Sequence, residues 1–575
     1  MSTRSPHDGP AAAWHRPDLG RSGPRVELRD RQSSPGERFT QHVEWEARQF
    51  SPAYDCGLSP GERLGKSVDL GGRRIIKKKQ LRWDTVRDSG ERSCYHRWTP
   101  RHRTLFFTGA AAVRRFPTGL SCLVLLVLSS VSMAAEPIAI GSRLELFADD
   151  FLIDKMTGDV VQRLHEPVPK EVVLVTDKPW EGNTCAYYTI FQDDNLYRMY
   201  YRGSHADEKT RKSLHPEVTC YAESRDGIHW TKPELGIVEW DGSRANNIIL
   251  KDLGTHNFVA FRDENPHCSP EARYKGIASG NRTRRGLFVF QSPDGIHWSL
   301  IKDEPVITKG AFDSQNLAFW DPFTKQYVDY HRIFVDGVRS IMTCTSDDYL
   351  NWTEPVLLKY PGAPKQHLYT NAIRPYPRAP HIRVGFPTRF LPEESSVEPI
   401  FMLSRDGVTF HRWNDPVIPQ TAPEDRDGNR SNYMASGLVQ LPGNDREYAV
   451  YGTEAYYAGP DSRLRRFMYR VDGFVSAHSG DDGGELITKP FTFQGNSLVL
   501  NFVTHDGGMI GVEVQDANGR PVSGFDLAAS AELKGDEIGQ TVSWSGDGKF
   551  GNLSGQLVRL RFRLKNADLF SMQVK

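Results

Sequence analysis

The heptapeptide SRDGIHW at residues 224–230 recurs almost unchanged as SPDGIHW at residues 292–298. Three weaker copies follow, SDDYLNW at 346–352, SRDGVTF at 404–410 and VDGF at 471–474. The aspartates that mark the five copies are Asp226, Asp294, Asp347, Asp406 and Asp472. Their spacing of roughly 50 to 70 residues suits a four-stranded blade better than a single hairpin. The repeat therefore predicts five blades of a β-propeller.

Each copy follows a short run of residues that favour β-strands, and Asp-Gly is a strong turn signal because glycine accepts a positive φ. A second repeated fragment comes after the turn, as EPV at 304–306 and 354–356 and DPV at 415–417. Proline cannot donate to a strand ladder, so this fragment predicts the outermost strand of each blade. The heptapeptide is then the hairpin between the third and fourth strands.

One copy of EPV stands before the first blade, in RLHEPV at residues 163–168, whereas the last blade has none of its own. We expect this segment to pair with the last blade and to close the ring. Residues 486–575 lack the repeat and show alternating strands with turns, which predicts a β-sandwich. The predicted fold class is all-β, with a five-bladed propeller at 143–480 followed by a C-terminal sandwich at 486–575.

The first 135 residues are predicted to lie outside this fold. Two arginines, Arg114 and Arg115, precede the apolar run at 120–128, and small residues follow up to Ala135. This pattern is typical of a secretory signal peptide at 113–135, and the run is shorter than the roughly 20 residues of a membrane-spanning helix.

Residues 1–112 are rich in arginine and lack hydrophobic periodicity, which predicts a spurious or disordered extension. The rival interpretations are a basic extension with a membrane anchor and a nucleic-acid-binding arm.

Charge supports this division of the chain. Residues 1–115 carry 23 basic and 13 acidic residues, whereas the remainder carries 49 and 59. The exported part is therefore mildly acidic, and we expect neither nucleic acid as a partner nor a stable membrane span. The predicted location is secreted or periplasmic.

Cofactor motifs are missing from the exported part, which has no phosphate-binding glycine loop and no CxxC pair. We therefore expect no cofactor and no metal, although the polar loop GSHADEK at 203–209 is a possible metal ligand set. Two alternatives stay open for the four remaining cysteines: all four are free thiols, or two of them form one disulfide. These are Cys185, Cys220, Cys268 and Cys344.

An asparagine stands at the start of each predicted innermost strand. The five are Asn183, Asn257, Asn316, Asn371 and Asn432. Asparagine often caps or turns a chain that enters a strand, which is the simpler interpretation. The functional interpretation is that the innermost strands of a propeller converge on its axis, so that residues at their mouths surround one cavity.

Five blades, Asp-Gly-x-x-Trp hairpins and a C-terminal sandwich resemble the secreted five-bladed propeller glycoside hydrolases of the family 32 and 43 type, especially the family-32-like group. The resemblance covers about residues 143–575 and implies a hydrolase that acts on a carbohydrate substrate. The Trp-Met-Asn-Asp-Pro signature of family 32 is missing, and the corresponding stretch is PWEGNT at 179–184.

Glycoside hydrolysis requires two carboxylates, one protonated as the acid and one ionised as the base or nucleophile. Asp313 is predicted to be the base or nucleophile, and Glu454 or Glu181 the acid. The predicted substrate-binding residues, besides the five asparagines, are Arg202, His256, His331 and Arg389. The alternative for each acid is an ion pair with a neighbouring arginine.

Two function classes follow: an exported glycoside hydrolase with a two-carboxylate mechanism in the axial cavity, and a propeller that binds glycans without cleaving them. They differ in whether two acids face one another across the cavity.

The signal-like segment generates a first prediction. We expect the exported protein to begin near Ala135 or Glu136, because the small residues there suit cleavage. N-terminal sequencing of the secreted protein measures this start. A mature start upstream of Arg114 would contradict the prediction.

Overall fold

The computed structural model describes residues 137–575 except residue 282, residues 420–432 and residue 547. The predicted extension at 1–112 and the predicted signal peptide at 113–135 lie outside these residues. In the part of the chain that the structure describes, no helix is long and apolar enough to span a membrane. The two helices found there are the short 3₁₀ turns η1 (Pro270–Ala272) and η2 (Phe550–Leu553).

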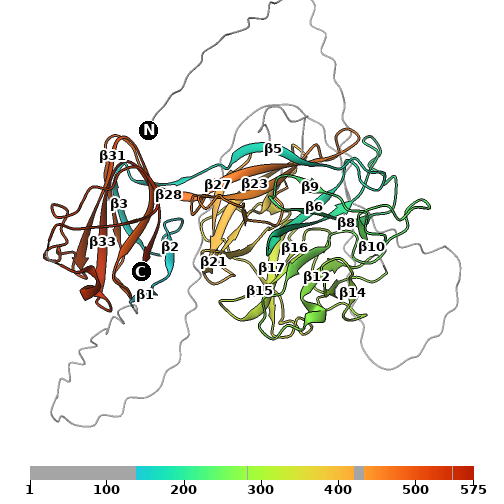
Figure 1. Cartoon of the computed structure of the whole chain (residues 1–575), viewed down its shortest axis with the longest axis horizontal. Helices are drawn as coiled ribbons and strands as arrows, with labels where there is room; N and C mark the ends of the chain where they lie inside the picture. Colours follow the sequence, from blue (N-terminus) through green and yellow to red (C-terminus); the bar gives the residue numbers. More distant parts are fainter. Residues whose placement is uncertain (1–136, 282, 420–432, 547) are drawn as a thin grey trace, which may run out of the picture. The chain divides into compact units, whose positions relative to one another are not determined.

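Five antiparallel sheets form the five blades of a propeller, which confirms the predicted class (Figure 1). Blade 1 contains β6 (Ala186–Asp193), β7 (Leu196–Gly203) and β8 (Val218–Ser224), with β9 (Trp230–Thr231) and β10 (Ile248–Lys251) both paired to β8. Blade 2 contains β11 (Val259–Arg262), β12 (Tyr274–Ser279), β13 (Leu287–Ser292) and β14 (Ser299–Leu300). Blade 3 contains β15 (Leu317–Asp321), β16 (Gln326–Val335), β17 (Val338–Ser346) and β18 (Val356–Leu357).

Blades 4 and 5 depart from this simple order. In blade 4 the second strand is divided into β21 (Ala379–Gly385) and β22 (Thr388–Leu391), and both parts pair with β23 (Ser396–Ser404). The other strands of blade 4 are β19 (His367–Leu368), β20 (Arg374–Tyr376) and β24 (Phe410–Pro416). Blade 5 contains β25 (Val439–Gln440), β26 (Glu447–Glu454), β27 (Arg463–Arg470) and, from far upstream in the chain, β5 (Val168–Val175).

The pairing of β5 with β27 closes the ring, as the upstream EPV copy predicts (Figure 1). The closing strand begins at Val168, where that copy ends. The residues just before it do not join the blade, because β4 (Val161–Leu164) pairs instead with β28 (Val475–Ser479). The closing strand therefore lies at Val168–Val175, just C-terminal to the expected segment at 163–168.

The repeated heptapeptide forms the hairpin between the third and fourth strands, and its side chains explain its composition. The hydroxyl of Ser224 accepts the N–H of Gly227, and the carboxylate of Asp226 accepts the N–H groups of Ile228 and His229. Gly227 has a φ of +72°, which favours glycine. The indole of Trp230 donates to the carbonyl of Gly227 at 3.1 Å.

The third copy differs from its predicted alignment. Ser346 bonds to Asp348, and Asp348 accepts the N–H groups of Leu350 and Asn351. The aspartate of this turn is therefore Asp348, two residues after the serine as in the other turns, and not Asp347. Tyr349 takes the left-handed position that glycine holds elsewhere, with a φ of +68°.

Tyrosine hydroxyls from one blade donate to the turn of the next blade. The donors and their glycine acceptors are Tyr451 to Gly227 (2.8 Å), Tyr200 to Gly295 (2.8 Å) and Tyr330 to Gly407 (2.9 Å). These bonds join blade 5 to blade 1, blade 1 to blade 2, and blade 3 to blade 4. The turn between the third and fourth strands of a blade therefore also contacts the neighbouring blade.

Ten strands form a separate sheet with its own apolar core. The C-terminal strands are β28, β29 (Gly484–Thr488), β30 (Phe491–Phe493), β31 (Leu498–Asp516), β32 (Asp536–Thr541) and β33 (Val558–Val574). The N-terminal strands are β1 (Ile138–Gly141), β2 (Leu144–Leu146), β3 (Ile153–Gly158) and β4.

The domain boundaries therefore differ from the predicted ones. Residues 138–164 join the sheet predicted to begin at residue 486, because β1 pairs with β30 and β2 with β33. Strands of this sheet that come from both ends of the chain lie side by side in Figure 1. That this sheet is a sandwich stays a prediction.

Ring closure generates a second prediction. Leu174 of β5 is 5% exposed and packs in the core shared by blades 1 and 5, whereas the adjacent Val175 is 38% exposed. We expect Leu174→Ala to lower the free energy of unfolding by about 2 to 5 kcal/mol and Val175→Ala to change it by less than about 0.5 kcal/mol. Chemical denaturation measures both. If Leu174→Ala lowers the free energy of unfolding as little as Val175→Ala does, β5 contributes no core contact to blade 5.

Candidate functional site

The innermost strands meet at a cavity of about 380 Å³ on the propeller axis. Its lining comes from all five blades and includes Thr189, Ala260, Ala318, Pro375 and Ser436. Gln315 of blade 3 donates across the axis to the carbonyl of Tyr188 in blade 1 at 2.9 Å. The innermost strands therefore converge on the axis, as the propeller architecture requires.

Outside the lining of this cavity, a chain of charged side chains connects blades 1, 2 and 3 at the N-terminal ends of the innermost strands. Arg202 lies 3.5 Å from Glu217, and Glu217 contacts Nδ1 of His256 at 2.8 Å. On the other side of the imidazole, Nε2 of His256 contacts Asp313 at 2.9 Å. The second oxygen of Asp313 lies 3.7 Å from the guanidinium of Arg332.

Aromatic side chains continue this chain through blades 4 and 5 and back to blade 1. The guanidinium of Arg332 lies 4.9 Å from the ring centroid of Tyr369. The ring centroids of Tyr369 and Tyr433 are 5.7 Å apart. Tyr433 in turn lies 5.4 Å from Tyr456, whose hydroxyl accepts a hydrogen bond from Arg202 at 2.9 Å. The contacts thus form a closed circle that follows the order of the blades. Its eight members, called the axial ring below, are Arg202, Glu217, His256, Asp313, Arg332, Tyr369, Tyr433 and Tyr456.

The two carboxylates that contact His256 favour its imidazolium form. Both of its ring nitrogens face carboxylate oxygens, and two such contacts are favourable only when both nitrogens carry a proton. Burial alone would lower the pKa of His256, but the hydrogen bonds to Asp313 and Glu217 outweigh burial and raise it. The bond pattern and the pKa direction therefore agree.

The two carboxylates of the axial ring are held ionised. Burial would raise the pKa of Glu217, but the His256 hydrogen bond and the charge of Arg202 lower it to about 2. For Asp313, burial is likewise outweighed by His256 and then Arg332, and its pKa falls well below the usual range. The side chain of Asp313 is nevertheless 65% exposed, so an ionised carboxylate is open to a ligand.

Strained backbone lies beside the axial ring. Tyr187, Ala455 and Tyr457 adopt φ values of +60°, +56° and +62°, which non-glycine residues rarely do. The ring of Tyr187 lies 4.8 Å from the guanidinium of Arg202 and 5.8 Å from the imidazole of His256. Such strain clusters at functional sites, because surrounding contacts must hold it in place.

The predicted acids Glu181 and Glu454 lie apart from the axial ring, inside blades 1 and 5. Lys232 contacts Glu181 at 2.6 Å, and the side chain of Glu181 is 0% exposed. Arg465 contacts Glu454 at 2.7 Å, and the side chain of Glu454 is also 0% exposed. The structure therefore brings Asp313 to the ring with Arg202 and His256, and it places the other two acids in buried ion pairs.

The predicted asparagines are buried and bond to backbone. Asn183, Asn257 and Asn371 each donate to a carbonyl of the neighbouring blade, and their acceptors are Gly459 (2.9 Å), Ser314 and Tyr330 (3.3 Å). Asn316 donates within its own blade to the carbonyls of Phe312 and Ser314. This arrangement favours the simpler interpretation, in which asparagine positions the entry to each innermost strand. Asn432 lies outside the described residues.

Two further predicted binding residues are engaged within their blades. Arg389 forms an ion pair with Glu398 and donates to the carbonyl of Asn414 at 2.7 Å. His331 is buried between Asp329 and the carbonyl of Lys309.

Three potential metal-ligand side chains also meet in blade 3. Asp329, His331 and Cys344 bring their ligand atoms within 4.8 Å of one another, and all three are buried. Burial raises the pKa of both Asp329 and Cys344, which favours their neutral forms. The four cysteines Cys185, Cys220, Cys268 and Cys344 are free thiols in the described structure.

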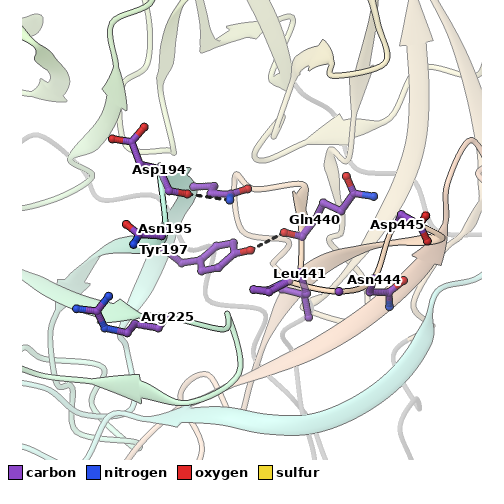
Figure 2. A pocket seen from close by; sticks show the side chains of 11 residues that line it. Asp194, Asn195, Tyr197, Arg225, Gln440, Leu441, Asn444 and Asp445 are labelled. Carbon is purple, nitrogen blue, oxygen red and sulfur yellow. Dashed lines mark hydrogen bonds between the residues drawn. The ribbon is translucent and has the colours of Figure 1, made fainter.

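An open groove of about 820 Å³ lies away from the axial ring, between the β6–β7 turn and the β25–β26 turn. Figure 2 shows its lining, with Tyr197 donating to the carbonyl of Gln440 at 2.6 Å across it. Its charged residues are Asp194, Arg225 and Asp445. The groove has the larger volume, but it does not combine ionised and aromatic groups from all five blades as the axial ring does.

Besides Arg332, which follows the predicted His331 directly, sequence reasoning missed four members of the axial ring: Glu217, Tyr369, Tyr433 and Tyr456. Tyr433 follows the predicted Asn432, and Tyr456 stands two residues after the predicted Glu454. Their proximity to predicted positions was therefore a usable signal. Tyr369 likewise stands two residues before the predicted Asn371, whereas Glu217 lies in a loop that no repeat marks.

No protein-family model matches the chain. Over 142 residues, or 24% of its length, the chain is 26% identical to uncharacterized proteins of two Mycobacterium tuberculosis strains, CDC 1551 / Oshkosh and ATCC 25618 / H37Rv. The chain matches 41% of the length of these curated relatives.

Solved structures resemble part of the chain. A structure described as a glycoside hydrolase has a TM-score of 0.39 with 12% identity, over 53% of this chain and 92% of that one. A glycosyl hydrolase from Bacteroides ovatus has a TM-score of 0.34 with 14% identity, over 55% and 96%. An endo-arabinase from Bacteroides thetaiotaomicron has a TM-score of 0.34 with 8% identity, over 52% and 98%. The five blades themselves rest on the sheet pairings given above.

The charge state of His256 generates a third prediction. Its pKa is raised in the folded protein, so His256 stabilises the fold fully below its ordinary pKa of about 6.5, and this stabilisation is lost as the pH rises through the folded pKa. We therefore expect His256→Gln to cost more free energy of unfolding at about pH 5.5 than at about pH 9.

Denaturation of the wild type and the variant at both pH values measures this difference. His267→Gln is the matched control, since no ion pair of His267 is found among the described residues. A cost of His256→Gln that is equal at both pH values would contradict the imidazolium assignment.

Proposed function

We propose that this protein is an exported glycoside hydrolase of the family 32 and 43 type, and that it acts on an oligosaccharide or polysaccharide at the axial ring. The observation that carries the proposal is Asp313. Its carboxylate is exposed, it is held ionised by His256 and Arg332, and it belongs to a ring that also contains Tyr369, Tyr433 and Tyr456. Aromatic faces suit the apolar faces of sugar rings, and an ionised carboxylate suits attack at the sugar carbon or at water.

The two oxygens of Asp313 have different tasks in this proposal. Oδ1 is bound by His256 at 2.9 Å, which fixes the orientation of the carboxylate. Oδ2 lies 3.7 Å from Arg332 and is the oxygen that takes a proton from water or bonds to the anomeric carbon. Glu217 acts through His256 and is therefore a positioning residue.

The mechanism also needs a protonated acid that gives its proton to the leaving oxygen. Glu217 does not fill this role, because a pKa of about 2 leaves it ionised. Glu454 and Glu181 are the proposed donors, and each would have to leave its buried ion pair to reach the substrate.

That same arrangement favours a second candidate function, a propeller that binds glycans without cleaving them. Both carboxylates of the axial ring are held ionised, so the ring by itself offers binding groups and a base. The two candidates differ in whether sugar is released.

The proposed base generates a fourth prediction. We expect Asp313→Asn to lower the rate of hydrolysis by about 10² to 10⁴ while the fold and the affinity for glycan change little. Release of reducing sugar from plant, algal and bacterial polysaccharides measures the rate, and calorimetry measures the affinity. Asp303→Asn is the control, since Asp303 is 86% exposed on another loop and pairs with Arg284.

The outcomes separate the two functions. Binding without released sugar in the wild type would establish the second candidate. If Asp313→Asn leaves hydrolysis unchanged, the role assigned to Asp313 is refuted, but the proposal that the protein is a glycoside hydrolase stands.

The proton donor has a separate test. An aryl glycoside with a good leaving group needs little protonation, so loss of the acid affects it less than a natural glycan. Glu454→Gln and Glu181→Gln are therefore compared on both substrates. A defect confined to the natural glycan identifies the donor, whereas a defect on both points to a change in the fold.

A further inference from the structure

Positive charge exceeds negative charge at the axial ring. Arg202, His256 and Arg332 are cations, whereas Glu217 and Asp313 are the two carboxylates that contact them. His256 already bonds to both carboxylates through its two ring nitrogens. The two carboxylates of the axial ring therefore contact three cations and cannot neutralise all of them.

Arg339 adds a fourth cation next to this group. Its guanidinium lies 5.1 Å from the centroid of Tyr369, whose ring Arg332 also contacts at 4.9 Å. Both guanidiniums also lie over Phe334, at 5.2 and 5.3 Å. Strands β16 and β17 thus bring two arginines to the same aromatic pair.

These two arginines have hydrogen-bonding capacity to spare. Nη1 of Arg332 and Nε of Arg339 are buried and have no hydrogen-bond partner among the described residues. Arg339 contacts the imidazole of His367 at 3.4 Å, and no carboxylate in the described part of the chain forms an ion pair with it. Even a half-buried guanidinium, as that of Arg339 is, is unfavourable without a counter-ion.

The electrostatics of Arg339 agree with this geometry. Burial lowers the pKa of its guanidinium, and the positive charge of Arg332 lowers it further, although Tyr369 acts in the opposite direction. A ligand anion between the two arginines would relieve both effects.

We propose that the axial ring accepts a glycan that carries an anionic substituent, and that this substituent is bound between Arg332 and Arg339. This inference rests on the proposed function in that the ligand is a glycan. A carboxylate of a uronic acid and a sulfate ester both present the planar or forked oxygens that guanidinium groups bind in pairs. The aromatic faces of Tyr369 and Tyr433 then receive the sugar ring that carries the charge.

Binding of matched charged and neutral glycans tests the proposal. The first pair is oligogalacturonate and its methyl ester, and the second is a sulfated carrageenan oligosaccharide, which contains no uronate, and its desulfated form. We expect the wild type to bind one charged member about 10 to 100 times more tightly than its neutral partner, with the preference weakening as salt is added. The two pairs distinguish a uronate from a sulfate ester.

Arg339→Gln should abolish this preference and leave the affinity for the neutral partner unchanged, whereas Arg339→Lys should retain part of it. Arg284→Gln is the matched control, because Arg284 is a 39% exposed arginine that pairs with Asp303 outside the ring. Because Arg339 lies at the edge of the ring and is only half-buried, the variant is expected to fold.

Each outcome is decisive. Equal binding of charged and neutral partners, or a preference that Arg339→Gln leaves intact, overturns the anionic inference while the glycan proposal stands. Binding of no member of either pair overturns the inference, and release of sugar from another polysaccharide would then show that the proposed function survives it.

Discussion

The antiparallel pairing of β5 with β27 is the constraint on which the site depends. A radial array of sheets leaves an open edge unless its first and last blades are joined, and open edges invite aggregation. Here the outer strand of blade 5 comes from residues 168–175, about 290 residues before its partner strand. Blade 5 also supplies Tyr433 and Tyr456 to the axial ring, and Tyr456 meets Arg202 of blade 1. The propeller and the axial ring of side chains are therefore both closed at the junction between blades 5 and 1.

The contacts between blades are polar as well as apolar. Tyrosine hydroxyls reach the glycine carbonyls of neighbouring turns, and asparagine amides reach neighbouring carbonyls near the axis. Buried polar groups of this kind are favourable only when they are paired, so they specify the register of one blade against the next. The axial ring inherits this precision, since each of its members is held by a different turn or strand end.

Local patterns in the sequence were enough to predict the blades. Serine, aspartate, glycine and tryptophan make their bonds within one hairpin, so the repeated residues alone predict that hairpin. The upstream EPV copy indicated the closing strand. The third turn shows the limit of alignment by eye, because Asp348 and not Asp347 follows the spacing from serine. The N-terminal strands of the ten-stranded sheet carry no repeat, and their pairing with β30 and β33 is decided by contacts distant in the chain.

The candidate site was harder to predict for the same reason. Asp313, Arg202 and His256 were singled out from their places near strand mouths, and they do meet. Glu181 and Glu454 occupy similar places in the sequence, yet their side chains point to Lys232 and Arg465 inside the blades. The direction of a side chain at a strand end depends on the partners that the folded chain brings next to it, which sequence periodicity does not report. Glu217 was missed because it lies in a loop outside every repeat, whereas Tyr369 stands two residues before the repeated Asn371, which was assigned instead.

The central claim is that the axial ring, and not the groove of Figure 2, is where a carbohydrate binds. A crystal structure of the protein with a bound oligosaccharide tests it most directly. The account predicts electron density for a sugar over Tyr369 and Tyr433, with an oxygen in contact with Asp313. Density confined to the groove lined by Tyr197 and Gln440, with the axial ring free of sugar, would contradict it.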